Sequence, residues 1–122
     1  MIQYYSQQPV ILYEDSTGSD QVVVFDEIML YARWYEYWLK ITGTLSTNPR
    51  IILTVYPKYN DIIAENQIAQ ISITPESLTT GDYCIILPLT ICIENKVDKF
   101  KLKFTLSDIL NGKIKKITRI AR

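Results

Sequence analysis

The stretch that decides the fold lies at residues 77–93 and reads SLTTGDYCIILPLTICI. A polar turn that contains Gly81 leads directly into Tyr83, and a long apolar run rich in β-branched residues follows. Such a run after a turn is typical of a central strand in a β-sheet. Residues 82–93 would span about 40 Å as one straight strand, which is too long for a domain of this size. We therefore expect Pro88 to mark a bend, a bulge or a change of sheet.

Further strands are predicted on both sides of this stretch. Residues 2–5, 9–14, 21–25, 50–57 and 67–74 are rich in β-branched or aromatic residues, and turn residues such as those at 14–20 separate them. The cleanest pattern follows at residues 99–106, where apolar and mostly basic residues alternate, as in a half-buried strand with a basic outer face. Its inward residues are Phe100, Leu102, Phe104 and Leu106, and its outward lysines are Lys99, Lys101 and Lys103.

Residues 26–43 can be interpreted with either a helical or a strand period. Ile28, Tyr31, Tyr35 and Trp38 would line one face of a helix. As a strand, the segment would turn Tyr35, Tyr37, Leu39 and Ile41 to one side and Glu36, Lys40 and Thr42 to the other. The aromatic and β-branched content favours a strand over residues 34–42 that ends at Gly43. For residues 27–33 the sequence does not decide between helix and strand.

The remaining segments complete an all-β pattern. Residues 44–49 and 58–66 are predicted loops, and residues 107–112 are a predicted turn with at most one helical turn. Residues 113–122 are predicted as a closing strand with a bulge, because Ile114, Ile117 and Ile120 are spaced by three. About eight short strands predict a single antiparallel β-sandwich domain over residues 1–122, with little helix.

Length and composition agree with one folded domain. The chain has 122 residues, of which 48% are hydrophobic and 21% charged, which is ordinary for a globular protein. The N-terminus has no signal-peptide pattern, and no apolar run reaches the roughly 20 residues of a membrane-spanning helix. Cys84 and Cys92 lie in one predicted strand, so we expect two free buried thiols.

The residue types exclude most enzymatic chemistry. The sequence has no histidine, which removes the common nucleophilic triads and nearly all catalytic zinc sites, and its four glycines are isolated rather than grouped in a phosphate loop. Carboxylate pairs could suit a glycosidase or a calcium site, but solvated acids explain them more simply. We expect no catalytic residue, no cofactor and no metal. The pairs are Asp26 with Glu27, Asp61 with Glu65, and Glu94 with Asp98.

Charge is distributed unevenly along the chain. Residues 1–95 hold 4 Lys and Arg against 11 Asp and Glu, and residues 96–122 hold 9 against 2. The asymmetry suits nucleic-acid contact, packing between copies, or a solvated outer face. If the last two strands pair, their basic residues would form a phosphate-binding face, although Phe100 and Phe104 point inward and leave it without aromatic rings. A basic strand can also protect a sheet edge from aggregation. The basic residues are Lys99, Lys101, Lys103, Lys113, Lys115, Lys116 and Arg119.

The aromatic residues around position 35 exceed what one thin core accommodates. Some of Tyr31, Trp34, Tyr35, Tyr37, Trp38 and Tyr56 are expected to face a partner. The alternatives are that they line the core and its rim, or that Trp34, Tyr35 or Trp38 forms a stacking platform for a carbohydrate.

A resemblance to a known family covers residues 77–119. Leu78-Thr-Thr-Gly81-Asp-Tyr83, a strand that ends near Leu89, the turn Asn111-Gly112-Lys-Ile114 and the segment Ile117-Thr118-Arg119 follow in that order. This order resembles the immunoglobulin-like β-sandwich modules of tailed-phage virions, such as the N-terminal domains of baseplate upper proteins and small head-decoration proteins. Gly81, Tyr83, Gly112, Thr118 and Arg119 occupy the matching positions.

The resemblance implies an immunoglobulin-like, non-enzymatic virion component. It would be made in the host cytoplasm and would bind copies of itself or another capsid or tail protein, with no membrane partner and with nucleic acid disfavoured. The alternatives are a nucleic-acid or polyanion binder that uses the basic C-terminal strands, and the carbohydrate-binding sandwich. The candidate interaction residues are Tyr31, Trp34, Tyr35, Trp38, Lys113, Lys115, Lys116 and Arg119.

Overall fold

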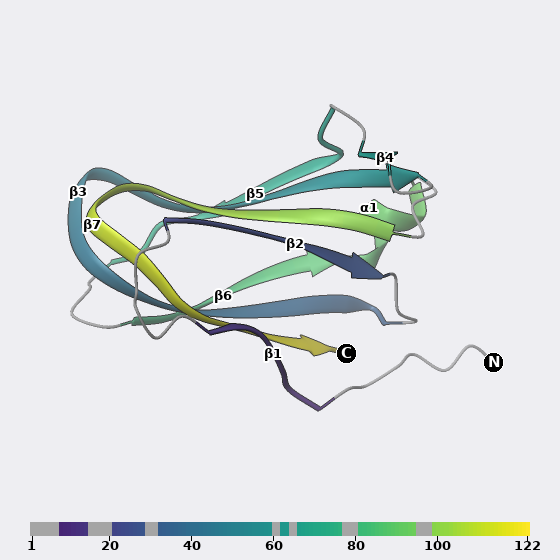
Figure 1. Ribbon diagram of the computed structural model, residues 1–122, viewed down its shortest axis with the longest axis horizontal. Helices are drawn as coiled ribbons and strands as arrows, with labels where there is room; N and C mark the ends of the chain where they lie inside the picture. The colour runs from purple at the N-terminus through teal and green to yellow at the C-terminus, as the bar shows by residue number, and fades with distance from the viewer. Residues whose placement is uncertain are drawn as a thin grey trace.

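The computed structural model describes residues 8–14, 21–28, 32–59, 62–63, 66–76, 81–94 and 99–122. Apart from one short helix, the regular elements in these residues are strands of one antiparallel, seven-stranded sheet (Figure 1). The elements are β1 (Val10–Glu14), β2 (Val22–Ile28), β3 (Trp34–Tyr59), β4 (Ile62–Ile63), β5 (Ala69–Ile73), β6 (Gly81–Pro88), α1 (Leu89–Glu94) and β7 (Lys99–Ala121).

β3 and β7 form the frame of the molecule. β3 is 26 residues long and β7 is 23, whereas strands usually have about 3–10 residues. The two strands pair from Tyr35 and Ala121 at one end to Lys58 and Lys99 at the other. Both bend back near their middle, so that the sheet folds over and its two halves lie face to face (Figure 1).

The two halves of the folded sheet form two layers. In the lower layer of Figure 1 the order is β6, β3 (residues 34–45), β7 (residues 109–121) and β1. In the upper layer the order is β5, β3 (residues 50–58), β7 (residues 99–107) and β2, and the two-residue strand β4 pairs with the end of β3 at Lys58 and Tyr59. The two ends of β7 therefore lie in different layers, and their outward side chains point to opposite sides of the molecule.

The bends are made by irregular backbone inside paired strands. In β7, Asp108 and Asn111 both have a φ of 54°, a left-handed conformation that Asp and Asn tolerate better than most residues. In β3, Gly43 has a φ of 141°. The register of β3 against β7 shifts around these positions, including a shift between Leu45 and Arg50. Such shifts leave residues unpaired and turn the strands.

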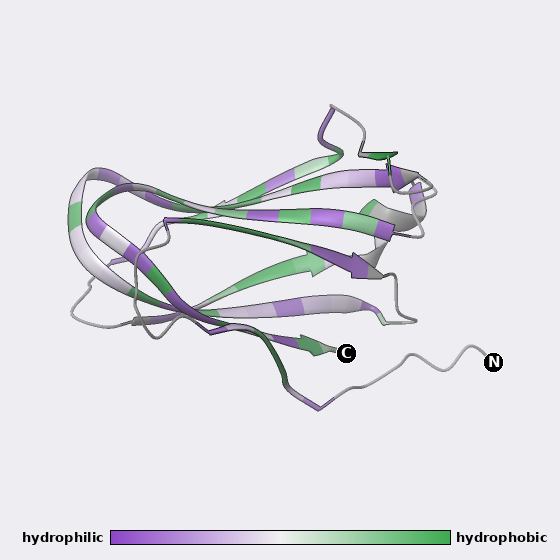
Figure 2. Cartoon of the chain, in the orientation of Figure 1, coloured by the Kyte–Doolittle hydropathy of each residue, from purple (hydrophilic) through white to green (hydrophobic). Residues whose placement is uncertain are grey.

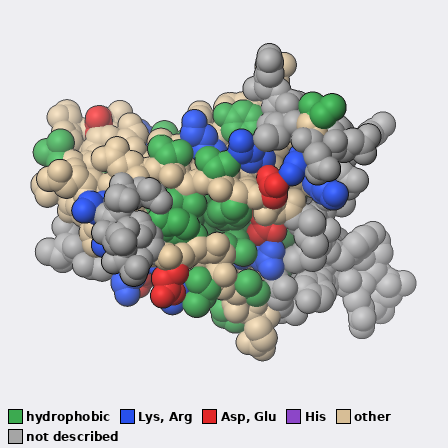
Figure 3. Space-filling view, viewed as in Figure 1, with side chains coloured by type: hydrophobic (Ala, Val, Ile, Leu, Met, Phe, Trp, Pro, Cys, Tyr) green, Lys and Arg blue, Asp and Glu red, His purple; other side chains and the backbone are tan. Residues whose placement is uncertain are grey.

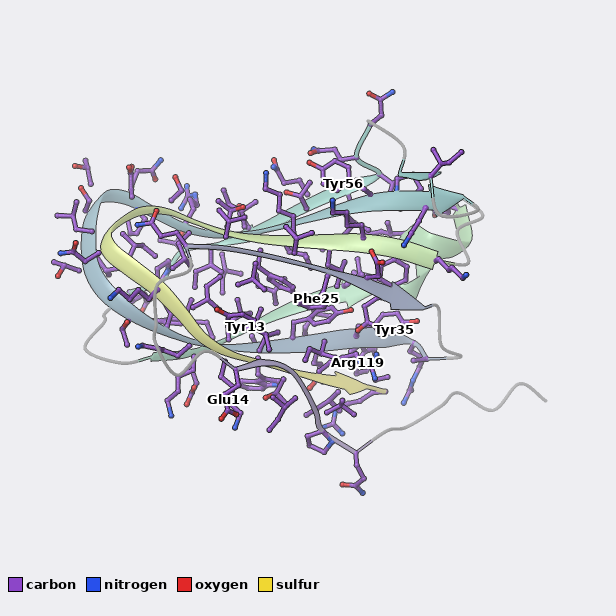
Figure 4. All side chains as sticks on the ribbon, in the orientation of Figure 1. Tyr13, Glu14, Phe25, Tyr35, Tyr56 and Arg119 are labelled. Atoms are coloured by element: carbon purple, nitrogen blue, oxygen red, sulfur yellow. The ribbon has the colours of Figure 1, made fainter. Side chains whose placement is uncertain are left out.

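The core lies between the two layers. The lower layer contributes Tyr35 and Tyr37, the upper layer contributes Phe100 and Phe104, and all four are fully buried. Tyr35 packs edge-on against Phe100 with ring centroids 5.9 Å apart, and Tyr37 packs similarly against Phe104 at 5.4 Å. Apolar and polar bands alternate along the long strands (Figure 2), and side chains fill the space between the layers (Figure 4). The alternation in sequence thus gives each layer one apolar face.

One ion pair is buried between the layers. Glu27 on β2 and Arg119 on β7 have side chains only 3% and 9% exposed. Arg119 Nη1 donates to both carboxylate oxygens of Glu27, at 2.9 and 2.6 Å, and the Tyr37 hydroxyl donates to Glu27 at 3.4 Å. Because Glu27 belongs to the upper layer and Arg119 to the lower, the pair joins the two layers. Figure 3 shows hydrophobic side chains gathered across the middle of the molecule in this view.

The all-β, antiparallel fold class is confirmed, and helix in the described residues is limited to α1. The strands predicted at residues 9–14, 21–25, 34–42 and 67–74 are present as β1, β2, the first part of β3, and β5. The immunoglobulin-like connectivity stays a prediction.

Two details of the predicted alternation are also confirmed. The inward set Tyr35, Tyr37, Leu39 and Ile41 is fully buried. The bulge expected in the closing strand lies at Lys115, because the register moves from Lys40 opposite Lys116 to Ile41 opposite Ile114.

Several local predictions are wrong. Residues 44–49 belong to β3 and residues 107–112 to β7, because the bends occur within paired strands rather than in loops. β3 also continues past Pro57 to Tyr59. The apolar run after Pro88 is not a strand but the helix α1. The predicted strand at residues 2–5 lies outside the described residues, as do residues 15–20 of the predicted turn and residues 29–31 of the segment left open.

Candidate interaction site

The first half of β3 places two tryptophans on the outer face of the lower layer. Tyr35 and Tyr37 point into the core, so Trp34, Glu36 and Trp38 point outward. Trp38 is 41% exposed and Trp34 is half-buried. An exposed tryptophan on the flat surface of a sheet is uncommon, because large aromatic side chains are mostly buried.

The neighbouring strands extend this apolar surface. In register with Trp34, Glu36 and Trp38, β6 carries Pro88, Ile86 and Cys84. On the other side, β7 carries Ile120 beside Glu36 and Thr118 beside Trp38. Beyond β7, Ile11 of β1 lies opposite Thr118 and is 55% exposed, and Ile86 is 48% exposed. We call this surface the tryptophan face: Ile11, Trp34, Glu36, Trp38, Cys84, Ile86, Pro88, Thr118 and Ile120.

Glu36 holds both indole rings in place. Trp34 Nε1 donates to Glu36 Oε1 at 2.9 Å, and Trp38 Nε1 donates to Oε2 at 3.4 Å. Arg122 Nε donates to Oε1 at 3.0 Å, and the guanidinium of Arg33 lies 5.1 Å from the centre of the Trp34 ring. Because the polar N–H groups are bonded within the chain, the indoles offer their apolar surfaces to a partner.

The surroundings of Glu36 change two pKa values. Burial acts to raise the pKa of the Glu36 carboxyl, but the hydrogen bonds from Trp34, Trp38 and Arg122 and the Arg122 charge outweigh it, so this pKa lies below its ordinary 4.5. Burial raises the pKa of the Cys84 thiol above its ordinary 9.0, and the Glu36 carboxylate adds to the effect. Cys84 is a free cysteine and stays a protonated, weakly nucleophilic thiol at neutral pH.

The acid titration of the tryptophans tests this arrangement. Because the pKa of Glu36 is lower in the folded than in the unfolded chain, its ionised form stabilises the folded state above pH 4.5, and this contribution is lost as the pH falls through the lowered pKa. We expect tryptophan fluorescence to stay constant from pH 7 to 5 and to change only below pH 4.5. Glu36→Gln should abolish this transition, and an unaltered transition in that variant would rule out Glu36 as its source.

A row of charged residues borders the tryptophan face on the side toward the bends. The row crosses four neighbouring strands in register. Its members are Asp82 on β6, Lys40 on β3, Lys116 on β7 and Glu14 on β1. An apolar centre with a charged border is the usual anatomy of a protein–protein interface.

The structure brings some of the predicted interaction residues together and separates others. Trp34 and Trp38 share the tryptophan face, whereas Tyr31 lies outside the described residues. Tyr35 is fully buried against Phe100, and Arg119 is buried against Glu27. The prediction that Tyr35 and Arg119 contact a partner is therefore wrong, because alternation turns both into the core.

The prediction that the C-terminal strands form a single basic face is also wrong. The two predicted strands are the two ends of β7, and instead of pairing with each other they lie in different layers. Lys113 and Lys116 lie on the lower layer with Lys115 at its bulge, whereas Lys99, Lys101 and Lys103 face outward from the upper layer. One strand thus presents two separate basic surfaces.

Sequence reasoning missed the role of Glu36 and the contribution of β6. The spacing Trp34-x-Glu36-x-Trp38 was the available signal, because a strand places residues two apart on the same face. Nothing in the sequence indicates that Cys84 and Ile86 lie beside the tryptophans, since β3 and β6 are separated by more than 20 residues.

Comparisons with known proteins add no relative: no family model, no curated protein and no solved structure matches this chain. Among the residues described, no three cysteine, aspartate or glutamate side chains are grouped so that they could hold a metal ion. In the same part of the chain, no helix is both long and apolar enough to cross a membrane.

Proposed function

We propose that this protein is a non-enzymatic structural protein that binds other proteins through the tryptophan face. The observation that carries the proposal is the pair of outward indoles, Trp34 and Trp38, held by the shared carboxylate of Glu36. Tryptophan and arginine are the residues most enriched among those that dominate binding energy at interfaces. Rings that are already held in position lose little conformational freedom when a partner binds.

The partner that we propose is another protein of the same assembly, including further copies of this chain. The assembly is a virion, with the chain as a head-decorating or a tail or baseplate component, because the order of motifs in residues 77–119 resembles modules of that kind. Such proteins act in many copies, so a moderate contact on one face is repeated across the particle.

Two features count against the alternative of a carbohydrate platform. Tyr35 points into the core, and the guanidinium of Arg33 covers the ring of Trp34. A sugar would then stack on Trp38 alone, whereas a protein partner can use the aliphatic side chains of β6, β7 and β1 as well.

Replacing Trp38 by alanine tests the proposal. We expect wild-type protein to show a weight-average mass above 14.2 kDa at high concentration in sedimentation equilibrium. Trp38→Ala should weaken this association about 10-fold or more, because truncating an interface tryptophan commonly costs over 2 kcal/mol. Val24→Ala is the matched control, because Val24 is similarly exposed, at 43%, on the opposite outer face.

A second arm tests other partners. Proteins encoded next to this one are mixed with wild-type and Trp38→Ala protein, and binding is measured by calorimetry. The proposal is overturned if the wild-type chain stays monomeric and binds none of these proteins, or if Val24→Ala weakens association as much as Trp38→Ala. A change in tryptophan fluorescence on addition of a glycan, without protein association, that Trp38→Ala abolishes would favour the carbohydrate alternative.

A further inference from the structure

The outer face of the upper layer carries a cluster of cations that is separate from the tryptophan face. Lys99, Lys101 and Lys103 point outward from β7, since Phe100, Leu102 and Phe104 between them are fully buried. The adjacent β3 adds Lys58 in register with Lys99, and Arg50 further along. We call this surface the lysine face: Arg50, Tyr56, Lys58, Lys99, Lys101 and Lys103.

Protection of a sheet edge does not explain these lysines. Gatekeeper lysines belong on edge strands, where backbone groups lack partners. Residues 99–105 of β7 are paired on both sides, with β2 on one and β3 on the other. The lysine row therefore lies on a central strand, where it has no unpaired edge to protect.

Few acids balance this charge. Among the described strand residues of this face, the single acid is Asp26, whose carboxylate binds Lys58 Nζ at 2.6 Å. Lys99, Lys101 and Lys103 make no ion pair with any residue in the described parts of the chain. Three ammonium groups on one strand are thus left available to an anionic partner.

An aromatic ring lies beside the middle of the lysine row. Tyr56 of β3 is in register with Lys101 of β7, so the two side chains are direct cross-strand neighbours and Lys99 and Lys103 are its diagonal neighbours. Tyr56 is half-buried on the outer side of the upper layer, whereas Phe25 and Tyr35 lie between the layers (Figure 4). The aromatic ring that the basic strand lacks in sequence is supplied by the adjacent strand.

We propose that the lysine face binds single-stranded nucleic acid. Outward lysines recur about every 7 Å along the strand. Their charges therefore form a row that can follow the phosphates of one extended nucleic-acid strand. Tyr56 provides a surface on which a base can stack, as aromatic residues do on other sheet surfaces that bind single strands. A duplex hides its bases inside the helix, so a flat face with one aromatic ring suits it less.

The salt dependence of binding tests the phosphate contacts. A fluorescein-labelled 20-nucleotide oligothymidine is titrated with wild-type protein between 50 and 200 mM NaCl, and anisotropy gives the dissociation constant. Three phosphate contacts predict a slope of about −2 for the logarithm of affinity against the logarithm of salt concentration. Changing Lys99, Lys101 and Lys103 together to glutamine should bring the slope close to zero. Absence of binding at 50 mM NaCl would overturn the proposal.

The other end of β7 provides a matched control. Changing Lys113, Lys115 and Lys116 to glutamine removes the same charge from the same strand, but from the opposite layer. This triple variant should keep the wild-type slope. If both triple variants lose affinity equally, the attraction is a property of overall charge and the proposed site is wrong.

Tyr56 distinguishes nucleic acid from other polyanions. Tyr56→Leu should weaken oligothymidine binding about 10-fold, because loss of a base-stacking ring typically has that effect or more, and Tyr56→Phe should bind like wild-type. Retention on heparin should be the same for all three proteins. If Tyr56→Leu binds oligothymidine as tightly as wild-type, or if a duplex of equal length binds more tightly than the single strand, the assignment to single-stranded nucleic acid is overturned.

Discussion

Replacing Arg119 by methionine is expected to lower the free energy of unfolding by about 3–5 kcal/mol. The change removes the cation that balances the buried Glu27 carboxylate, to which Arg119 Nη1 donates at 2.6 and 2.9 Å. Glu27 belongs to the upper layer and Arg119 to the lower, so the loss also removes a direct link between the layers. Urea denaturation followed by circular dichroism measures the effect.

Two further variants separate a buried charge from a general loss of charge. Lys58→Met breaks the pair with Asp26, in which the Lys58 side chain is 14% exposed and the Asp26 side chain 58% exposed. Because one partner stays in contact with water, the change should cost only about 1 kcal/mol. The double variant Glu27→Leu with Arg119→Met should regain much of the lost stability, because a buried ion pair can often be replaced by apolar side chains. A cost for Arg119→Met no larger than that for Lys58→Met would contradict the importance of the buried pair.

Replacing Gly43 by valine is expected to destabilise the protein by about 2–5 kcal/mol. Gly43 lies where β3 bends, with a φ of 141° that side-chain-bearing residues rarely adopt. A Cβ atom there would lie 2.7 Å from Ile109 Cγ2 and 2.9 Å from the Cα of Gly112 on β7. The backbone of β7 cannot move away without disturbing its own bend. The substitution would therefore disturb the face-to-face packing of the two layers.

The adjacent residue is the control for Gly43. Thr44 is exposed, and Thr44→Val should alter the free energy of unfolding by no more than about 0.5 kcal/mol. Midpoints of urea denaturation compare the two variants directly. Equal midpoints would show that the close approach of Gly43 to Gly112 is not needed for the stability of the folded protein.

Much of the layer structure could be predicted from short-range patterns. The alternation at Tyr35, Tyr37, Leu39 and Ile41 identified the inward face of β3, and the alternation at residues 99–106 identified that of β7. These predictions succeeded because a strand has a period of two, so one buried face leaves a direct trace in the sequence.

The long strands could not be predicted in the same way. Residues 44–49 and 107–112 have the composition of turns, yet each bends within a continuous strand because β3 and β7 pair with each other on both sides of the bend. Which distant segment supplies those pairs is not encoded locally. The run after Pro88 shows the same limit, because residues rich in β-branched side chains form α1 where no neighbouring strand is paired with them.

The candidate sites also have some features that the sequence predicts and others that only strand pairing decides. That Trp34 and Trp38 lie outward on one face follows from the spacing around Glu36. The register between strands far apart in the chain decides the other features. It buries Arg119, turns Lys116 outward and places Tyr56 beside Lys101. Arg119, Lys116 and Tyr56 each lie beside a residue of another strand, and no pattern within their own segments indicates that neighbour.

The stretch at residues 77–93 by itself determined that a strand follows Gly81 and is interrupted at Pro88, because proline has no backbone N–H to donate to a sheet. The alternation of apolar residues likewise determined the all-β class and the two apolar faces. Only the tertiary structure decided that β6 pairs beside the tryptophans and that the two ends of β7 lie in opposite layers. The physical reason is that side-chain period is local, whereas strand pairing is a long-range choice made when the folded sheet closes over its core.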